Sequence, residues 1–150
     1  MSPSSIDYRQ MTSPCGLDCF NCPAHLAMTD DEERARWAQM TGKPLEEAFC
    51  TGCRNEGGAI SLFGRDKPCS AWTCVQEKGL EFCCDCEEFP CDNLHPYVDR
   101  ASVVPHNTKV FNLGLIKRMG LESWAEEKAK TVREVYFNAP FGSCGGTCST

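Results

Sequence analysis

The densest cysteine segment of this chain is residues 50–91, which read CTGCRNEGGAISLFGRDKPCSAWTCVQEKGLEFCCDCEEFPC. Eight of the chain's 13 cysteines lie in it. Two pairs have the Cys-x-x-Cys spacing, Cys50 with Cys53 and Cys83 with Cys86, and a single tight turn can point both sulfurs of such a pair at one ion. This spacing is typical of zinc knuckles and ribbons, so the segment predicts a fold that is held together by metal.

The apolar residues are spread unevenly along the chain. With 150 residues it has the length of one domain, which would bury roughly 70% of the surface that its unfolded chain exposes. The cysteine-rich middle is poor in Ile, Leu and Val, however, and clear apolar periodicity begins only after residue 107. We therefore expect metal crosslinks to supply the folding free energy that burial alone cannot supply in the middle.

The expected fold class is mainly α, with a small irregular cysteine-rich metal-bound core of zinc-knuckle-like loops and a C-terminal helical hairpin. The expected divisions are a leader at 1–14, a single metal-bound domain at 15–137 and a flexible tail at 138–150. Within that domain we expect a cysteine-rich core at 15–106 and the hairpin at 107–137.

Local signals place four helices. A capping box of Thr29 and Glu32 predicts a helix that ends at Thr41, with Trp37 and Met40 on its buried stripe. Ser70 could cap a short helix that runs to Lys78 and is closed by a glycine. The arms of the hairpin are predicted at 107–120 and 122–137, where apolar residues recur at helical spacing.

The net charge and the composition of the chain argue against one class of partner and indicate a cellular compartment. The formal net charge is −6, and each zinc ion bound by four thiolates would add two negative charges, which argues against nucleic acid as a partner.

Residues 1–13 show no secretory signal, and no apolar run reaches the roughly 18 residues of a membrane span. We therefore expect a cytoplasmic protein, whose clustered thiols favour metal over disulfides. Its partner is left open, with another protein as a candidate.

Cys15, Cys19 and Cys22 form a second cysteine motif, with the spacing Cys-x3-Cys-x2-Cys. The same spacing occurs in the iron-sulfur loop of radical-SAM enzymes, but those enzymes need a large βα barrel, and no repeated strand-helix pattern follows here. We interpret the motif as three ligands of a closed zinc site that is completed from elsewhere in the chain.

These motifs together resemble those of a family. The run Cys15-Gly16-Leu17-Asp18-Cys19-Phe20-Asn21-Cys22-Pro23-Ala24, an acidic helix, Cys50-Thr51-Gly52-Cys53, Cys74 and the stretch from Cys83 to Phe89-Pro90-Cys91 occur in that order. Over roughly residues 14–96 the chain is similar to a cysteine-rich bacterial and archaeal family known as a domain of unknown function, DUF3795. The resemblance implies metal binding and no established activity. The chain departs from the family pattern at two places. Many members carry one more cysteine just before the position of Cys69, which this chain lacks, and Cys84 is an additional cysteine here.

The predicted metal ligands are Cys15, Cys19, Cys22, Cys50, Cys53, Cys69, Cys74, Cys83, Cys86 and Cys91. They suffice for about two zinc ions, since a closed site takes four thiolates. One partition gives a first zinc to Cys50, Cys53, Cys69 and Cys74, and a second to Cys15, Cys19, Cys22 and one of Cys83, Cys86 and Cys91. In the other partition, Cys50 and Cys53 bind one zinc together with Cys83 and Cys86. Each histidine, His25, His95 or His106, stands alone and is a weaker candidate.

No acid-base or nucleophilic constellation can be assembled from the sequence, so no catalytic residue and no organic cofactor are predicted. The preferred function is a zinc-binding protein whose metal is mainly structural, acting as a scaffold or interaction module. The alternative is an iron-sulfur or thiol-redox protein that uses the same cysteines, because thiolates alone do not select zinc over iron. An enzyme would need an open metal position and a nearby base.

Overall fold

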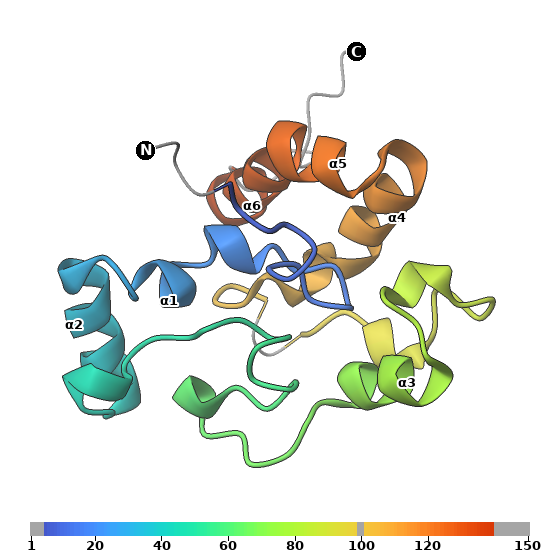
Figure 1. Ribbon diagram of the computed structural model, residues 1–150. Coiled ribbons are helices and arrows are strands. Elements are labelled where there is room, and N and C mark those ends of the chain that lie inside the picture. Colours follow the sequence, from blue (N-terminus) through green and yellow to red (C-terminus); the bar gives the residue numbers. More distant parts are fainter. Residues whose placement is uncertain (1–4, 99–100, 140–150) are drawn as a thin grey trace.

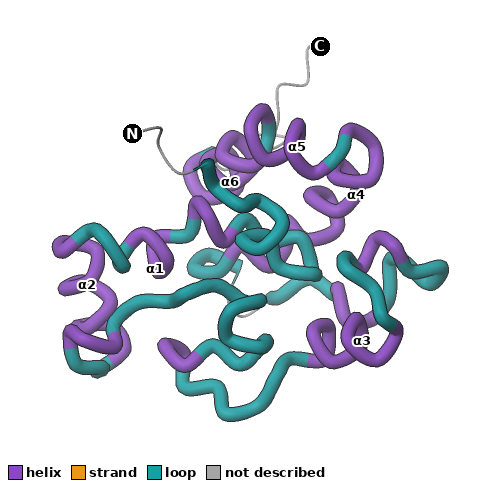
Figure 2. Tube along the Cα trace, viewed as in Figure 1, coloured by secondary structure: helices purple, strands orange, loops and turns teal. Residues whose placement is uncertain are grey.

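The computed structural model of the chain describes residues 5–98 and 101–139. It confirms a mainly helical, cysteine-rich fold (Figure 1, Figure 2). The α-helices are α1 Pro23–Leu26, α2 Asp31–Thr41, α3 Ser70–Lys78, α4 Lys109–Met119, α5 Leu121–Glu127 and α6 Ala129–Asn138. Short 3-10 turns lie at Cys19–Asn21, Leu45–Glu47, Ser61–Phe63, Cys83–Asp85, Asp92–Leu94 and Pro105–Thr108. Within the described ranges no strand forms, and long loops join α2 to α3 and α3 to α4 (Figure 2).

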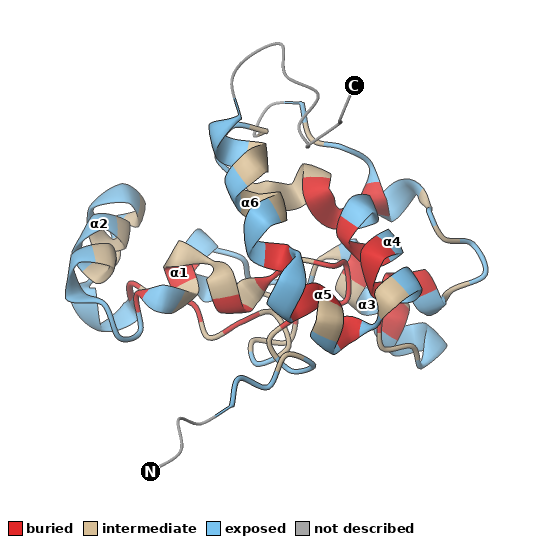
Figure 3. Cartoon of the chain, turned by 90° about the horizontal axis from the view of Figure 1, so that it is seen from above, coloured by how far each residue is buried: buried red, intermediate tan, exposed pale blue. Residues whose placement is uncertain are grey.

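The C-terminal helices form the predicted hairpin with one modification. Helix α4 packs on α5, and α5 on α6. The second arm is two helices rather than one, because Lys128 leaves the helical region at φ −127° and ψ −41°. Leu113 and Trp124 are both fully buried there (Figure 3 shows the buried residues of α4 and α5 in red).

One apolar core joins these helices to the cysteine-rich part. Phe20 and Phe82 of the cysteine-rich part belong to the same buried cluster as Leu113 and Trp124. The rings of Phe20 and Trp124 meet edge to face, with their centroids 5.9 Å apart. The two parts of the sequence therefore share a core rather than burying separate ones.

Polar contacts fix the loop around Cys15 on the C-terminal helices. The buried Asn112 amide donates to the Gly16 carbonyl at 2.8 Å and accepts from the Trp124 indole N–H at 3.2 Å. Gly16 has φ +90°, and a Cβ there would lie 2.8 Å from Leu113 Cγ. Glycine is therefore required where the loop meets α4, both for its backbone conformation and for the close approach.

A buried ion pair adds a second attachment. The Arg133 guanidinium on α6 donates to the Asp18 carboxylate, with its shortest contact, from Nη2, at 2.6 Å. The Asp18 side chain is 2% exposed and that of Arg133 is 13% exposed. Since Asp18 lies between Cys15 and Cys19, this pair holds the first cysteine motif in place.

Helix α2 departs from its predicted packing. Its cap is Asp30, whose carboxylate accepts from the N–H groups of Glu32 and Glu33, rather than the predicted Thr29. The predicted buried stripe is wrong: no α2 residue is buried and Met40 is 60% exposed. The helix lies at the edge of the molecule (Figure 3). Trp37 is partly buried there against the cluster of Ala24, Cys50 and Leu62.

Part of the segment assigned to the leader is packed. Thr12 and Ser13 are buried, and the Tyr8 ring lies edge to face against Phe20 with centroids 5.0 Å apart. Cys144 and Cys148 of the predicted tail lie outside the described residues. Among the helices that are described, none has the length and apolar content needed to cross a membrane.

Candidate metal centre

The 11 cysteines of the described chain are all unpaired thiols, and all lie between Cys15 and Cys91. Their environments divide them into groups. We call the first the central thiol group, defined as Cys15, Cys19, Cys53 and Cys69. We call the second the cavity thiols, defined as Cys74, Cys83, Cys86 and Cys91, which line a cavity of about 400 Å³ beside α3.

Cys53 shows that the central thiol group is close together. Burial raises the pKa of its thiol, and the neighbouring thiols of Cys15, Cys19 and Cys69 raise it further, while the Arg54 guanidinium lowers it. Thiols at this range disfavour one another's ionisation, because several thiolates in a poorly hydrated place repel. The thiols of Cys15 and Cys19, and that of Cys69 from another segment, therefore lie near Cys53.

Cys15 and Cys19 reach this region from the first cysteine loop. Burial raises the pKa of Cys15, while nearby Lys109 and a hydrogen bond with the Ser13 hydroxyl, at 3.1 Å, lower it. Burial raises the pKa of Cys19 to about 12, although the backbone N–H of Cys53 donates to its sulfur and opposes the shift. The loop and the Cys50–Cys53 turn thus meet directly.

Arg54 anchors that turn. Its Nε donates to the Thr12 carbonyl and its Nη2 to the Glu81 carbonyl, both at 2.7 Å, and its guanidinium lies 5.0 Å from the centroid of the Phe82 ring. One side chain therefore links the N-terminal loop, the Cys53 turn and the segment that leads to Cys83.

Cys69 is held at the start of α3. It is the N-cap residue, and its sulfur accepts from the Trp72 N–H at 3.5 Å. Trp72 in turn packs against Gly58, where φ is +80° and a Cβ would lie 2.4 Å from the Trp72 ring. The indole thus covers the loop after Cys53.

Cys22 and Cys50 lie beside the central thiol group. They share a small apolar cluster with Ala24 and Leu62. The thiol of Cys50 donates to the Glu56 carboxylate at 3.1 Å, and burial together with this contact raises the pKa of Cys50, even though the Gly52 N–H donates to its sulfur. A neighbouring carboxylate disfavours the thiolate form of Cys50, whose thiol is engaged with Glu56.

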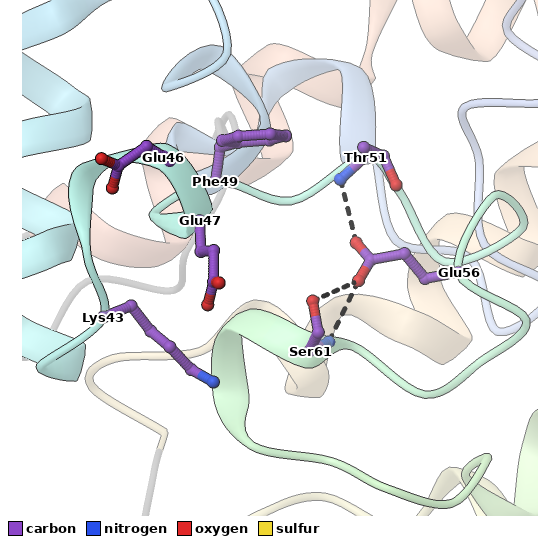
Figure 4. Close-up of a pocket in the computed structure, with 7 residues that line it drawn as sticks. All are labelled: Lys43, Glu46, Glu47, Phe49, Thr51, Glu56 and Ser61. Atoms are coloured by element: carbon purple, nitrogen blue, oxygen red, sulfur yellow. Dashed lines mark hydrogen bonds between the residues drawn. The ribbon is translucent and has the colours of Figure 1, made fainter.

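Glu56 organises the outer side of this turn. Its carboxylate accepts from the Thr51 N–H at 2.9 Å and from both the N–H and the hydroxyl of Ser61 at 3.0 Å (Figure 4). These bonds lower the pKa of Glu56 against the opposing effect of burial. It borders a cavity of about 380 Å³ whose other lining residues are Lys43, Glu46, Glu47, Phe49, Thr51 and Ser61.

The grouping of the thiols differs from both expected partitions. Cys69 lies with Cys15 and Cys53, whereas Cys74 lines the cavity with the cysteines of 83–91. Helix geometry explains the separation of Cys69 from Cys74: residues five apart point about 140° away from each other around a helix of 3.6 residues per turn. Cys69 and Cys74 therefore lie on different sides of α3.

The remaining candidates have other contacts. The ring of His25 hydrogen bonds with the Cys50 carbonyl at 3.0 Å, and that of His95 contacts the Asp92 carboxylate at 3.3 Å. Cys84 is buried in the main core. Across residues 5–98 and 101–139, no three His, Cys, Asp or Glu side chains converge tightly enough to hold an ion as they lie. Metal binding would therefore draw the thiols inward.

The comparisons agree with the family resemblance. The model of a family described as "Protein of unknown function (DUF3795)" matches residues 11–96, which is more than half of the chain, and the chain therefore belongs to this family. No curated protein and no solved structure matches it.

Proposed function

We propose that this DUF3795 protein is a zinc-binding protein in which zinc, held by the central thiol group, has a mainly structural role. The observation that carries the proposal is the proximity of thiols from three segments: the Cys53 N–H donates to the sulfur of Cys19, and the thiols of Cys15, Cys19 and Cys69 all raise the pKa of Cys53. Four thiolates in a closed tetrahedron suit zinc and leave no position for a substrate water.

Electrostatics support a divalent cation at this place. Lys109 lies near Cys15 and Arg54 near Cys53, so two cations face four thiols. Without metal, burial favours the protonated thiols of Cys15, Cys19 and Cys53, whereas a bound zinc ion would deprotonate its ligands and offset their mutual repulsion. Backbone N–H groups that donate to the sulfurs of Cys19 and Cys69 would stabilise the thiolates in the complex.

The consequence of such a site is mechanical. It would join the loop of Cys15 and Cys19 to the Cys53 turn and to the N-terminus of α3, three segments with little regular structure between them. Metal-ligand bonds would then hold these loops together, as hydrogen-bonded strands or packed helices do in other proteins. The protein would be a rigid scaffold or interaction module rather than an enzyme.

The test is the zinc content and stability of Cys53→Ser. We expect this variant to lose one zinc equivalent per chain and to unfold at lower denaturant concentration. Cys84→Ala removes a buried thiol outside both groups and should keep all its metal. Cys50→Ser should also keep its metal, because Cys50 donates to Glu56. Unchanged zinc in Cys53→Ser, or iron in place of zinc, would refute the proposal.

A further inference from the structure

The cavity beside α3 has features of its own. It holds about 400 Å³ and is lined mainly by residues of α3 and of the segment 83–93, which follows α3 in the chain. Its lining residues are Ala71, Cys74, Val75, Lys78, Leu80, Cys83, Cys86, Glu88, Phe89, Cys91, Asp92 and Asn93. Four of these are the cavity thiols, so a third of the lining residues are cysteines.

Local structure explains why the four thiols share the cavity. Cys74 lies on the α3 face that also carries Ala71 and Lys78, since residues three and four apart share a side of a helix. Cys83 and Cys86 flank a 3-10 turn in which the Cys86 N–H donates to the Cys83 carbonyl at 3.2 Å. Cys91 precedes the 3-10 turn Asp92–Leu94, which packs on α3.

The sulfur of Cys86 has two hydrogen-bond donors beside it. Its sulfur accepts from the Lys78 ammonium at 3.2 Å and from the Glu88 N–H at 3.4 Å. Lys78 also pairs with the Glu88 carboxylate at 2.6 Å. Ligand sulfurs in metal centres are stabilised by such donors, and a nearby ammonium offsets part of the negative charge of four thiolates.

We propose that the cavity thiols form a second, independent site for a soft divalent cation, of which zinc is the physiological choice. Four thiolates select a thiophilic metal with tetrahedral preference. The cavity is wider than an ion needs, and its thiols do not converge as they lie, so binding draws the half-exposed Cys86 and Cys91 toward α3.

This site differs from the central one in that its four thiols line one cavity. Burial alone does not distinguish the two groups, since each has one buried thiol, Cys83 or Cys15, and three half-buried ones. The cavity of about 400 Å³ gives a chelator a route to a metal bound by the cavity thiols. We therefore expect the outer metal to be the exchangeable one. Cys83 also lies near Cys15 of the central group. The two sites nevertheless share no ligand, and either assignment can fail without the other.

The experiment measures zinc release from the purified protein, with a coloured chelator as the probe. We expect one zinc equivalent per chain to leave rapidly and a second to leave slowly. The double variant Cys86→Ser/Cys91→Ser should lose the rapid equivalent and keep the slow one, and Cys84→Ala should keep both. A double variant that retains both equivalents overturns the proposal. One slow equivalent in the unaltered protein overturns this site alone, whereas no zinc at all overturns the central site as well.

A second measurement on the unaltered chain applies even where the double variant does not fold. The protein is alkylated with iodoacetamide before and after the rapid phase, and the labelled cysteines are identified by mass spectrometry. We expect the cavity thiols to be protected at first and labelled together afterwards, while the central thiol group stays protected. Labelling of Cys86 and Cys91 that does not change on chelation would contradict the proposal.

Discussion

Residues 11–96 and residues 105–138 reach a folded state by different means. The first region contains every described cysteine, and its α-helices are three short ones separated by loops. The second contains no cysteine and forms three consecutive helices around Leu113 and Trp124. The first is rich in residues that can bind metal, and the second in residues that gain free energy from burial.

The contrast explains why the molecule would need both. A polar, glycine-rich loop such as 51–61 has little apolar surface to bury, so its conformation must be fixed by hydrogen bonds, by Arg54 and, in our account, by metal. Helices α4–α6 need no metal of their own, but the surfaces they bury belong partly to the first region. Loss of metal should therefore act strongly on one region and indirectly on the other.

Chelation should have the largest effect. We expect removal of zinc at neutral pH to unfold most of residues 15–91, because thiols without metal cannot crosslink these loops, while α4–α6 keep part of their helicity. Hydrogen exchange would show this as loss of amide protection in the first region and partial protection in the second. An unchanged exchange pattern would mean that the cysteines are packed thiols in a fold that needs no metal.

Trp124→Ala should have the next largest effect. The side chain is fully buried, and truncation of such an aromatic residue costs roughly 3–5 kcal/mol. The variant also leaves the Asn112 amide oxygen without its indole donor. The measurement is denaturant unfolding, with Phe111→Ala as the control, since Phe111 is 59% exposed and should change stability little. Equal losses in both would show that the helical region is not packed as described.

The sequence predicted the helical fold and the cysteine-rich core well, because caps and apolar periodicity are local signals. Lys78 followed by a glycine ends α3 as expected, and Gly42 ends α2. The prediction of a buried stripe on α2 was wrong, because the packing of distant loops decides whether Met40 contacts another element. The break between α5 and α6 at Lys128 could not be predicted either, because no glycine or proline marks it in the sequence.

The partition of the thiols was harder to predict than their number. Cys-x-x-Cys spacing shows that two sulfurs can reach one ion, but it does not show which other pair joins them. In our proposal the direction of α3 decides this, since Cys69 and Cys74 lie on different sides of the helix. The contact of Arg133 with Asp18 joins residues 115 positions apart, and no local pattern predicts it.

Asp18→Asn tests the join between the regions. Removing the charge leaves Arg133 mostly buried without its carboxylate, and breaking such a pair costs about 3 kcal/mol. In a double-mutant cycle, Arg133→Met should restore part of the loss. If Asp18→Asn and Arg133→Met act additively, the ion pair contributes nothing and another contact holds the two regions together.

Asp30→Ala should have the smallest effect. It removes the side-chain cap of α2, which is worth about 1 kcal/mol of helix stability. Because α2 buries no residue, global unfolding and zinc content should change little, while amide exchange in its first turn becomes faster. Loss of zinc in this variant would show that α2 supports the metal-binding loops.

The most direct test of the account is the metal content of the protein purified without added metal or oxygen, determined by elemental analysis together with its visible absorption. We predict about two zinc ions per chain and a colourless protein, since eight thiols in two groups serve two closed sites. A brown protein that contains iron, or a folded protein that contains no metal, would contradict the account.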